Sequence, residues 1–293
     1  MESLILECKD VCKSYKEKVV LNNLNLTVES GKIYGLIGRN GVGKTTLLSI
    51  VTGQNKATGG DVTINGENVW ENEKLLAKMC FSREISGSNQ DGISMMKVKD
   101  YLDAAKTYFP AWDKEMADNL VKEFGLEVKK PMVKLSKGML SMVTIIVALA
   151  SKAPITILDE PVAGLDVFSR KKFYQLILDE YTETQRTFII STHIIEEAAD
   201  IFEEVIILDN GKVICKENTQ ELIERTVRVT GLESEVDKAV KGFNIIAKER
   251  TGRGMAVTVS LKDGQSIDET YDVTVNALGL SDIFVAMCND KGE

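Results

Sequence analysis

Residues 38–45 constrain the fold of this chain most, because their spacing, Gly-x-x-x-x-Gly-Lys-Thr, requires a defined backbone course. An apolar run at 33–37 precedes them, and a helical pattern begins at Lys44. Glycines let successive N–H groups curl around a phosphate, and the positive end of the following helix strengthens the attraction. We expect Lys44 to reach the β- and γ-phosphates of a nucleotide and Thr45 to offer its hydroxyl to Mg²⁺. A glycine-rich turn without a ligand fits the same letters, but the flanking strand and helix favour phosphate binding.

A second motif combines a buried strand with two acidic residues. Residues 155–158 are apolar or small, and Asp159 and Glu160 follow them directly. Asp159 is placed to hold Mg²⁺, directly or through water, and Glu160 to take a proton from an attacking water. A solvated acidic turn would have the same sequence, but the phosphate loop elsewhere in the chain favours the catalytic interpretation.

The order of predicted elements indicates an α/β fold with a largely parallel sheet. Strands are predicted at 23–29, 33–37, 155–158, 187–191 and 205–208, a hairpin at 61–69 with its turn near Asn65-Gly66, and helices within 94–150, at 167–184 and from 194. After about residue 226 the pattern changes to short strands at 227–229 and 256–261 and short helices at 233–241 and 281–288. The sequence therefore predicts a domain at 1–225, with a helical part at about 94–150, and a small α+β domain at 226–293.

Composition excludes several classes of protein. The 293 residues carry a net charge of -8, which argues against a broad nucleic-acid-binding surface. His193 is the one histidine, so sites built from several histidines are excluded. The five cysteines lack metal-binding spacing and are expected to be free thiols in a reducing cytosol. The start of the chain does not match a signal peptide, and no apolar run reaches the ~20 residues that a membrane helix needs.

Several further motifs, taken in order, resemble those of the ATP-binding subunits of ABC transporters over about residues 1–225. The segment 135–139, Leu-Ser-Lys-Gly-Met, resembles the LSGGQ signature, with Lys137 and Met139 departing from it. The segment 164–166, Gly-Leu-Asp, resembles the D-loop, and 191–193, Ser-Thr-His, resembles the switch-histidine segment. Tyr15 matches the aromatic residue that stacks on adenine. Without this context, Ser136 would be equally well explained as the N-cap of a helix.

The resemblance implies a P-loop NTPase cassette with a RecA-like core, an antiparallel β subdomain and a helical subdomain, followed by the small C-terminal domain. It implies catalysis by Glu160 assisted by His193, which would hydrogen-bond the γ-phosphate. Mg²⁺ would be held by Thr45, Asp159 and Glu84. ATP would be bound within the subunit by Tyr15, Gly38, Arg39, Asn40, Gly41, Val42, Gly43, Lys44, Thr45, Thr46 and Glu84. A second cassette would contribute, from its own copies, Ser136, Lys137, Gly138, Met139 and Asp166.

Glu84 is a departure from the resemblance. It follows the strand that leads into the helical part, where the family usually has glutamine. A carboxylate ligates Mg²⁺ but adds negative charge near phosphates and lacks an amide donor. We expect Glu84 to keep the metal-sensing role with an altered rate.

The partners are also implied by resemblance. The aromatic segment 108–113 and the segment 280–284 resemble those of bacterial exporters, a subgroup that includes exporters of antimicrobial peptides and phenol-soluble modulins. The expected partners are a separate transmembrane permease and a second ATPase subunit, identical or paralogous, at the cytoplasmic face of the membrane. Local core packing explains Phe109 and Trp112 equally well.

Two other functions fit parts of the pattern. Ribosome-associated ABC ATPases carry two cassettes and chromosome-associated ones a long coiled-coil insertion, whereas this chain has one cassette and a short interval between Lys44 and Ser136. A regulatory, non-hydrolysing module is disfavoured by Glu160 and His193, while Glu84 and Met139 leave it open. The prediction is an ATP-hydrolysing transport motor, with a soluble or regulatory ABC ATPase as the alternative.

Overall fold

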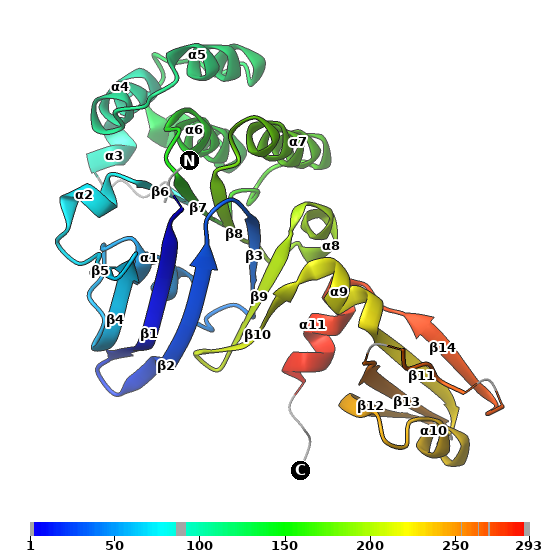
Figure 1. Cartoon of the computed structure of the whole chain (residues 1–293). Helices are drawn as coiled ribbons and strands as arrows, with labels where there is room; N and C mark the ends of the chain where they lie inside the picture. Colours follow the sequence, from blue (N-terminus) through cyan, green and yellow to red (C-terminus); the bar gives the residue numbers. More distant parts are fainter. Residues whose placement is uncertain (1–2, 86–91, 253, 263, 269, 290–293) are drawn as a thin grey trace.

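The computed structural model describes residues 3–85, 92–252, 254–262, 264–268 and 270–289. The extreme ends of the two predicted domains, 1–2 and 290–293, therefore lie outside the described residues, as does the start of the segment used to judge a signal peptide. Three β-sheets with helices packed against them make up the described chain (Figure 1).

The central sheet has six strands, and five of them are parallel. Its order is β10 (Lys212–Asn218), β9 (Glu204–Asp209), β3 (Ile33–Ile37), β8 (Thr187–Ser191), β7 (Ile155–Asp159) and β6 (Met79–Arg83). Only β10 runs antiparallel to its neighbour. Strands β3, β7 and β8 are buried along their whole length, and most of their residues are apolar, as expected for strands covered on both faces. The predicted α/β fold with a largely parallel sheet is confirmed.

A smaller antiparallel sheet covers one side of the core. It contains, in order, β2 (Lys18–Glu29), β1 (Ile5–Tyr15), β4 (Gly59–Ile64) and β5 (Glu67–Asn68). The predicted turn at Asn65-Gly66 is present, and both residues have positive φ. Strand β1 was not predicted, because its register shifts between Cys8 and Val11 break the alternation of buried and exposed residues. Helix α1 (Lys44–Val51) shares one apolar cluster with both sheets.

The helical part of the chain lies at the opposite end from the C-terminal sheet (Figure 1). Its elements are α3 (Gly92–Met95), α4 (Val98–Tyr108), α5 (Lys114–Glu123), a 3₁₀ turn (Met132–Lys134) and α6 (Lys137–Ala150). The short helix α2 (Glu73–Leu76) precedes β6 and packs instead in the apolar cluster of the two sheets. Helix α6 is apolar on nearly all sides and buried from Leu140 onward except for Met142, so it connects this part to the core. Phe109 is buried in the same cluster and Trp112 packs against it, so both aromatic side chains take part in local core packing.

The remaining elements follow the acidic pair. They are α7 (Val167–Thr184), α8 (Ile195–Ala198), a 3₁₀ turn (Ala199–Ile201), α9 (Thr219–Arg225), β11 (Thr226–Leu232), α10 (Glu233–Ala239), β12 (Asn244–Thr251), β13 (Gly254–Ser260), β14 (Val273–Ala277) and α11 (Leu280–Cys288). The third sheet has the order β12-β13-β11-β14 and is antiparallel throughout. Helix α10 covers it through Val236 and Ala239. Strands β12 and β14 had no clear sequence pattern.

Helix α11 packs on the central core, although it lies at the end of the predicted C-terminal domain. Ile283 is fully buried and lies in the same apolar cluster as Ile195, Ala198 and Phe202. The helix sits between the third sheet and the central core (Figure 1). Burial of these side chains means that the last helix in the described part of the chain completes the core of the segment predicted as the first domain.

Ile283→Ala is therefore expected to lower the free energy of unfolding of the whole chain by about 2–5 kcal/mol, because it leaves a cavity in a shared core. Denaturant unfolding followed by circular dichroism measures the change. Val285→Ala on the same helix is the control, since Val285 is 48% exposed. Equal stability of the two variants would contradict the shared core.

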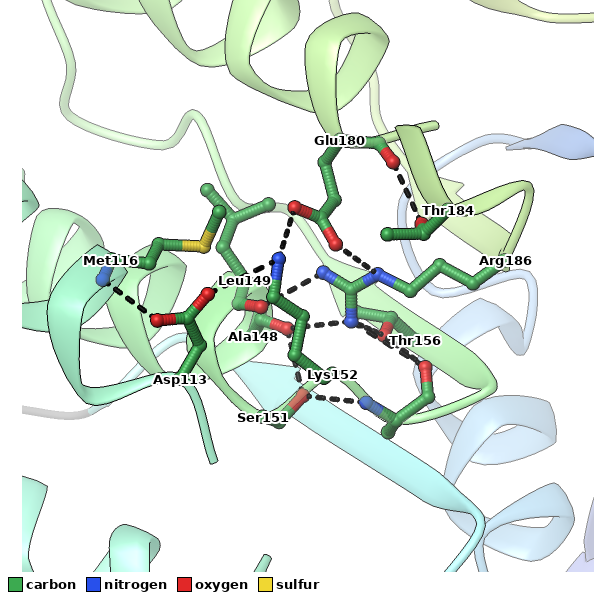
Figure 2. A network of polar contacts seen from close by, with 11 residues as sticks. Asp113, Met116, Ala148, Leu149, Ser151, Lys152, Thr156, Glu180, Thr184 and Arg186 are labelled. Carbon is green, nitrogen blue, oxygen red and sulfur yellow. Dashed lines mark hydrogen bonds and ion pairs between the residues drawn. The ribbon is translucent and has the colours of Figure 1, made fainter. Parts of the chain in front are cut away.

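A network of charges joins the helical part to helix α7 and to strand β7 (Figure 2). The Arg186 side chain is 2% exposed, and its Nε lies 3.1 Å from Glu180 Oε1. Lys152 Nζ bridges Glu180 Oε2 at 2.7 Å and Asp113 Oδ2 at 3.5 Å. Asp113 in turn caps helix α5 by accepting from Met116 N. Two acids and two bases thus balance, while burial lowers the pKa of the Arg186 guanidinium.

Glu180→Gln is expected to destabilise the chain by about 3–5 kcal/mol, because the buried Arg186 loses its counter-charge. Adding Arg186→Met should recover part of this loss. The control is Glu183→Gln, an exposed position on the same helix. Thermal and denaturant unfolding of wild type and the three variants measures these changes. A Glu180→Gln protein as stable as the control would refute the pairing of Glu180 with Arg186.

Candidate nucleotide-binding site

The glycine-rich loop joins β3 to α1 at the carboxyl edge of the parallel sheet. Gly41 and Gly43 have φ of 79° and 115°, in the region that favours glycine. A Cβ on Gly38 would lie 2.7 Å from the carbonyl oxygen of Leu208. Val42 N donates to the carbonyl of Arg39, which closes the turn. The loop backbone is thus fixed by steric demands that only glycine meets.

Lys44 lies under this loop and braces it. Its side chain is largely buried, and Nζ donates to the carbonyl oxygens of Gly38 at 2.6 Å and Arg39 at 3.4 Å. Burial lowers the pKa of this ammonium, and the charges of Glu160 and Asp159 oppose the shift. A cation held at a desolvation cost at the start of helix α1, beside the glycine-rich loop, favours a bound polyanion.

Asp159 is held by two hydroxyl groups. Thr45 Oγ1 donates to Asp159 Oδ2 at 2.6 Å, and Ser191 Oγ donates to Asp159 Oδ1. Strands β7 and β8 are neighbours with Asp159 opposite Ser191, so the sheet register makes this contact. Sequence reasoning placed Ser191 in the switch segment but gave it no role at the site. A small polar residue at the end of a fully buried strand was the available signal.

Glu160 is the next residue and faces two basic side chains. Its Oε2 lies 2.7 Å from His193 Nδ1, and its Oε1 lies 4.0 Å from Lys44 Nζ. The backbone of Glu160 has φ 51°, a conformation that non-glycine residues rarely adopt and that is often found at active sites. Its N–H donates to the carbonyl of Ser191, which fixes the turn. The predicted pair Glu160 and His193 is brought together.

A cavity of about 360 Å³ opens beside these groups. It is lined by Thr45, Arg83, Glu84, Ile85, Ile93, Asp159 and Glu160. Among the described residues, no three His, Cys, Asp or Glu side chains gather closely enough to hold a metal alone. Mg²⁺ usually takes one or two protein oxygens and completes its shell with phosphates and water.

The signature-like segment lies at the start of α6 and packs against the D-loop-like segment. Ser136 is the N-cap and accepts from Met139 N at 3.2 Å. A Cβ on Gly138 would lie 2.7 Å from the carbonyl oxygen of Gly164. Met139 packs on the core rather than projecting freely. Asp166 is the N-cap of α7 and accepts from Ser169 N, and these hydrogen bonds lower its pKa.

Tyr15 is the last residue of β1, and its side chain contacts Asn55 and Lys13. Its hydroxyl accepts from Asn55 Nδ2 at 2.5 Å, and Lys13 Nζ lies 5.0 Å from the ring centre. The ring is about half exposed. Two further predicted binding residues, Arg39 and Asn40, are exposed on the glycine-rich loop. Thr46 is half-buried in the first turn of α1.

Comparison with known proteins identifies the family. The sequence model described as ABC transporter matches residues 21–163. The bacitracin transport ATP-binding protein BcrA of Bacillus licheniformis is 33% identical over 215 residues, covering 72% of this chain and 69% of that protein. The chain belongs to the ABC transporter ATP-binding proteins. It is accordingly an ATPase that hydrolyses ATP to power transport.

Two further relatives of this ABC cassette extend the comparison. The Bacillus subtilis ABC transporter ATP-binding protein YtrB is 24% identical over 293 residues, covering 98% of this chain and 99% of that protein. The dimeric ATP-binding cassette MJ0796, solved in a post-hydrolysis state with ADP and Pi, is 27% identical with a TM-score of 0.62, covering 73% of this chain and 98% of that one. The predicted cassette fold is confirmed. ABC cassettes dimerise and work with transmembrane permeases, and no helix in the described part of this cassette is long and apolar enough to cross a membrane.

Proposed function

We propose that this cassette is the ATP-hydrolysing subunit that drives export of a peptide or an amphipathic, drug-like cargo through a separate permease at the cytoplasmic face of the membrane. Two relatives named for peptides support the cargo: BcrA, a bacitracin transport protein, and SrtF of Streptococcus pyogenes, a lantibiotic transport protein, which is 28% identical over 97% of its length. Nothing in the comparisons favours the regulatory alternative.

The observation that carries the hydrolytic role is the pair Glu160–His193 beside Lys44 and the Thr45–Asp159 contact. In the proposal, Glu160 accepts the proton of the attacking water while His193 holds that carboxylate and the water in line. Thr45 and Asp159, with Glu84 at the cavity wall, would hold Mg²⁺, which supplies charge neutralisation at the phosphates. Loop residues 38–46 would bind the phosphates, and Tyr15 would stack on adenine.

Two cassettes, identical or paralogous, would enclose ATP between them. The segment 136–139 and Asp166 of one cassette would complete the site of the other. The N-terminus of α6 carries a positive partial charge suited to a phosphate across the interface. We also propose that residues 1–225, with their helical part at 94–150, form the cassette and that 226–293 form an accessory domain whose last helix returns to the cassette core.

Gly138→Ala tests the shared site. The added Cβ meets a backbone oxygen at 2.7 Å and must displace either α6 or the D-loop, so we expect at least about a tenfold loss of Mg-ATP hydrolysis with ATP binding to the single cassette retained. Phosphate release measures the rate of hydrolysis, and nucleotide titration measures ATP binding. Gly279→Ala, with nothing within 4 Å, is the control. Loss of binding together with hydrolysis would argue against a role in the partner's site.

The cargo is tested in the cells that encode the chain. Replacing the gene with the Glu160→Gln version should raise sensitivity to bacitracin-like or lantibiotic peptides while growth without peptide is unchanged. Unaltered sensitivity to both classes would remove the support for peptide export and leave the ATPase role standing.

A further inference from the structure

Two charged residues that depart from the family pattern contact each other in this structure. Lys137 Nζ lies 3.0 Å from Glu84 Oε1, and both side chains are about half exposed. Glu84 stands where the family usually has glutamine, and Lys137 stands at the first glycine of the signature. Each departure alone would change the local charge of the nucleotide site, whereas together they cancel.

Glu84 belongs to the cavity of the candidate metal site. It follows β6, and the parallel pairing of Arg83 with Asp159 brings it to the same sheet edge. Glu84, Asp159 and Glu160 all line the cavity of about 360 Å³, and Arg83 is the basic residue in its lining. Three carboxylates around one cavity repel each other unless cations compensate, so a partner for Glu84 has an electrostatic effect there.

Lys137 reaches Glu84 from the signature and passes over the D-loop. It is the first residue of α6, where a cation is disfavoured by the positive end of the helix unless an anion is near. A Cβ on Gly164 would lie 2.7 Å from Lys137 Cγ, so the lysine stem rests on that glycine. The pair therefore ties together the signature, the D-loop and the wall of the metal cavity within one cassette.

We propose that the Glu84–Lys137 ion pair is an internal latch in which Lys137 competes with the divalent cation for Glu84, so that loading Mg²⁺-nucleotide releases Lys137 and the signature for the second cassette. This rests on the proposed function. While Lys137 holds Glu84, the carboxylate is neutralised and the start of α6 is tethered to its own site. Release leaves Lys137 as a free cation beside Ser136, where the phosphates of the second cassette's ATP would attract it.

Lys137→Met keeps the unbranched stem over Gly164 but removes the competing charge. A fluorescent ADP analogue, titrated with Mg²⁺ on the full chain, should reach half-saturation at about two- to fivefold lower Mg²⁺ than with wild type, the range expected for a partly exposed pair. Lys137→Arg should keep the wild-type value. In the Glu84→Gln background Lys137→Met should have no further effect, and at about 1 M salt the difference should shrink because the charges are screened.

Lys134→Met is the matched control, an exposed lysine three residues earlier for which a wild-type Mg²⁺ dependence is expected. Melting temperatures identify any variant that fails to fold, and Lys137→Arg then decides the result. An identical shift of Lys137→Met in both backgrounds, or no shift in either, would overturn the latch while nucleotide binding remained. A wild-type chain that bound no Mg²⁺-nucleotide would instead refute the proposed function.

Discussion

Glu160→Gln is expected to lower the rate of ATP hydrolysis by at least about 100-fold while ATP binding is retained. A positioned general base contributes roughly 10²- to 10⁴-fold, and an amide cannot accept the proton of water. The substitution preserves size, and the amide can still hydrogen-bond to His193, which lies 2.7 Å from the carboxylate. Glutamine has the same shape as glutamate and must adopt the same rare backbone conformation, with φ 51°, so folding should be unaffected.

Because the bound ATP is no longer consumed, this variant should also accumulate as a dimer. Phosphate release at saturating Mg-ATP measures the first effect, and light scattering with and without ATP measures the second. Glu183→Gln, which makes the same chemical change at an exposed position on α7, should hydrolyse ATP like wild type. A Glu160→Gln protein that turned over normally would eliminate Glu160 as the base.

The local parts of the fold were predictable because each is a short contiguous motif. The strand–loop–helix around residues 38–45 and the strand ending at Asp159 needed only hydrophobic runs and glycine spacing. Strand β1 was missed because a bulge at Asp10, with φ 50°, interrupts its alternation. An irregular strand has a clear pattern only once its partners β2 and β4 are known.

The contacts between distant segments could not be predicted in the same way. Ser191 meets Asp159 because β7 and β8 are neighbours in a specific register, and sequence order alone does not set that register. The pairing of Glu84 with Lys137 depends on where β6 ends relative to α6. Helix α11 has an apolar face that fits any nearby core, so its return to the cassette needed coordinates. In each case the sequence shows the type of residue but does not show which distant residue it contacts.

Lys44→Met should lower the affinity for ATP by about 100-fold or more while leaving the empty protein as stable as wild type or more so. Methionine keeps an unbranched stem in the largely buried position but cannot donate to phosphate. Two charge-assisted hydrogen bonds, each of about 1.5–3 kcal/mol, correspond to a loss of affinity of about 100-fold or more. The buried ammonium has a lowered pKa, so folding of the wild type is penalised by keeping it charged.

The lowered pKa of Lys44 also predicts how the stability of wild type changes with pH. Between its lowered folded pKa and its ordinary value of 10.5, Lys44 binds fewer protons in the folded state than in the unfolded state, so its contribution to stability becomes more favourable as pH rises. The stability of wild type relative to Lys44→Met should therefore increase toward pH 10.5 and be lowest near neutrality. Denaturant unfolding at several pH values measures this, and nucleotide titration measures the loss of binding. A marked loss of stability at neutral pH would show that Lys44 supports the loop chiefly through its bonds to Gly38 and Arg39.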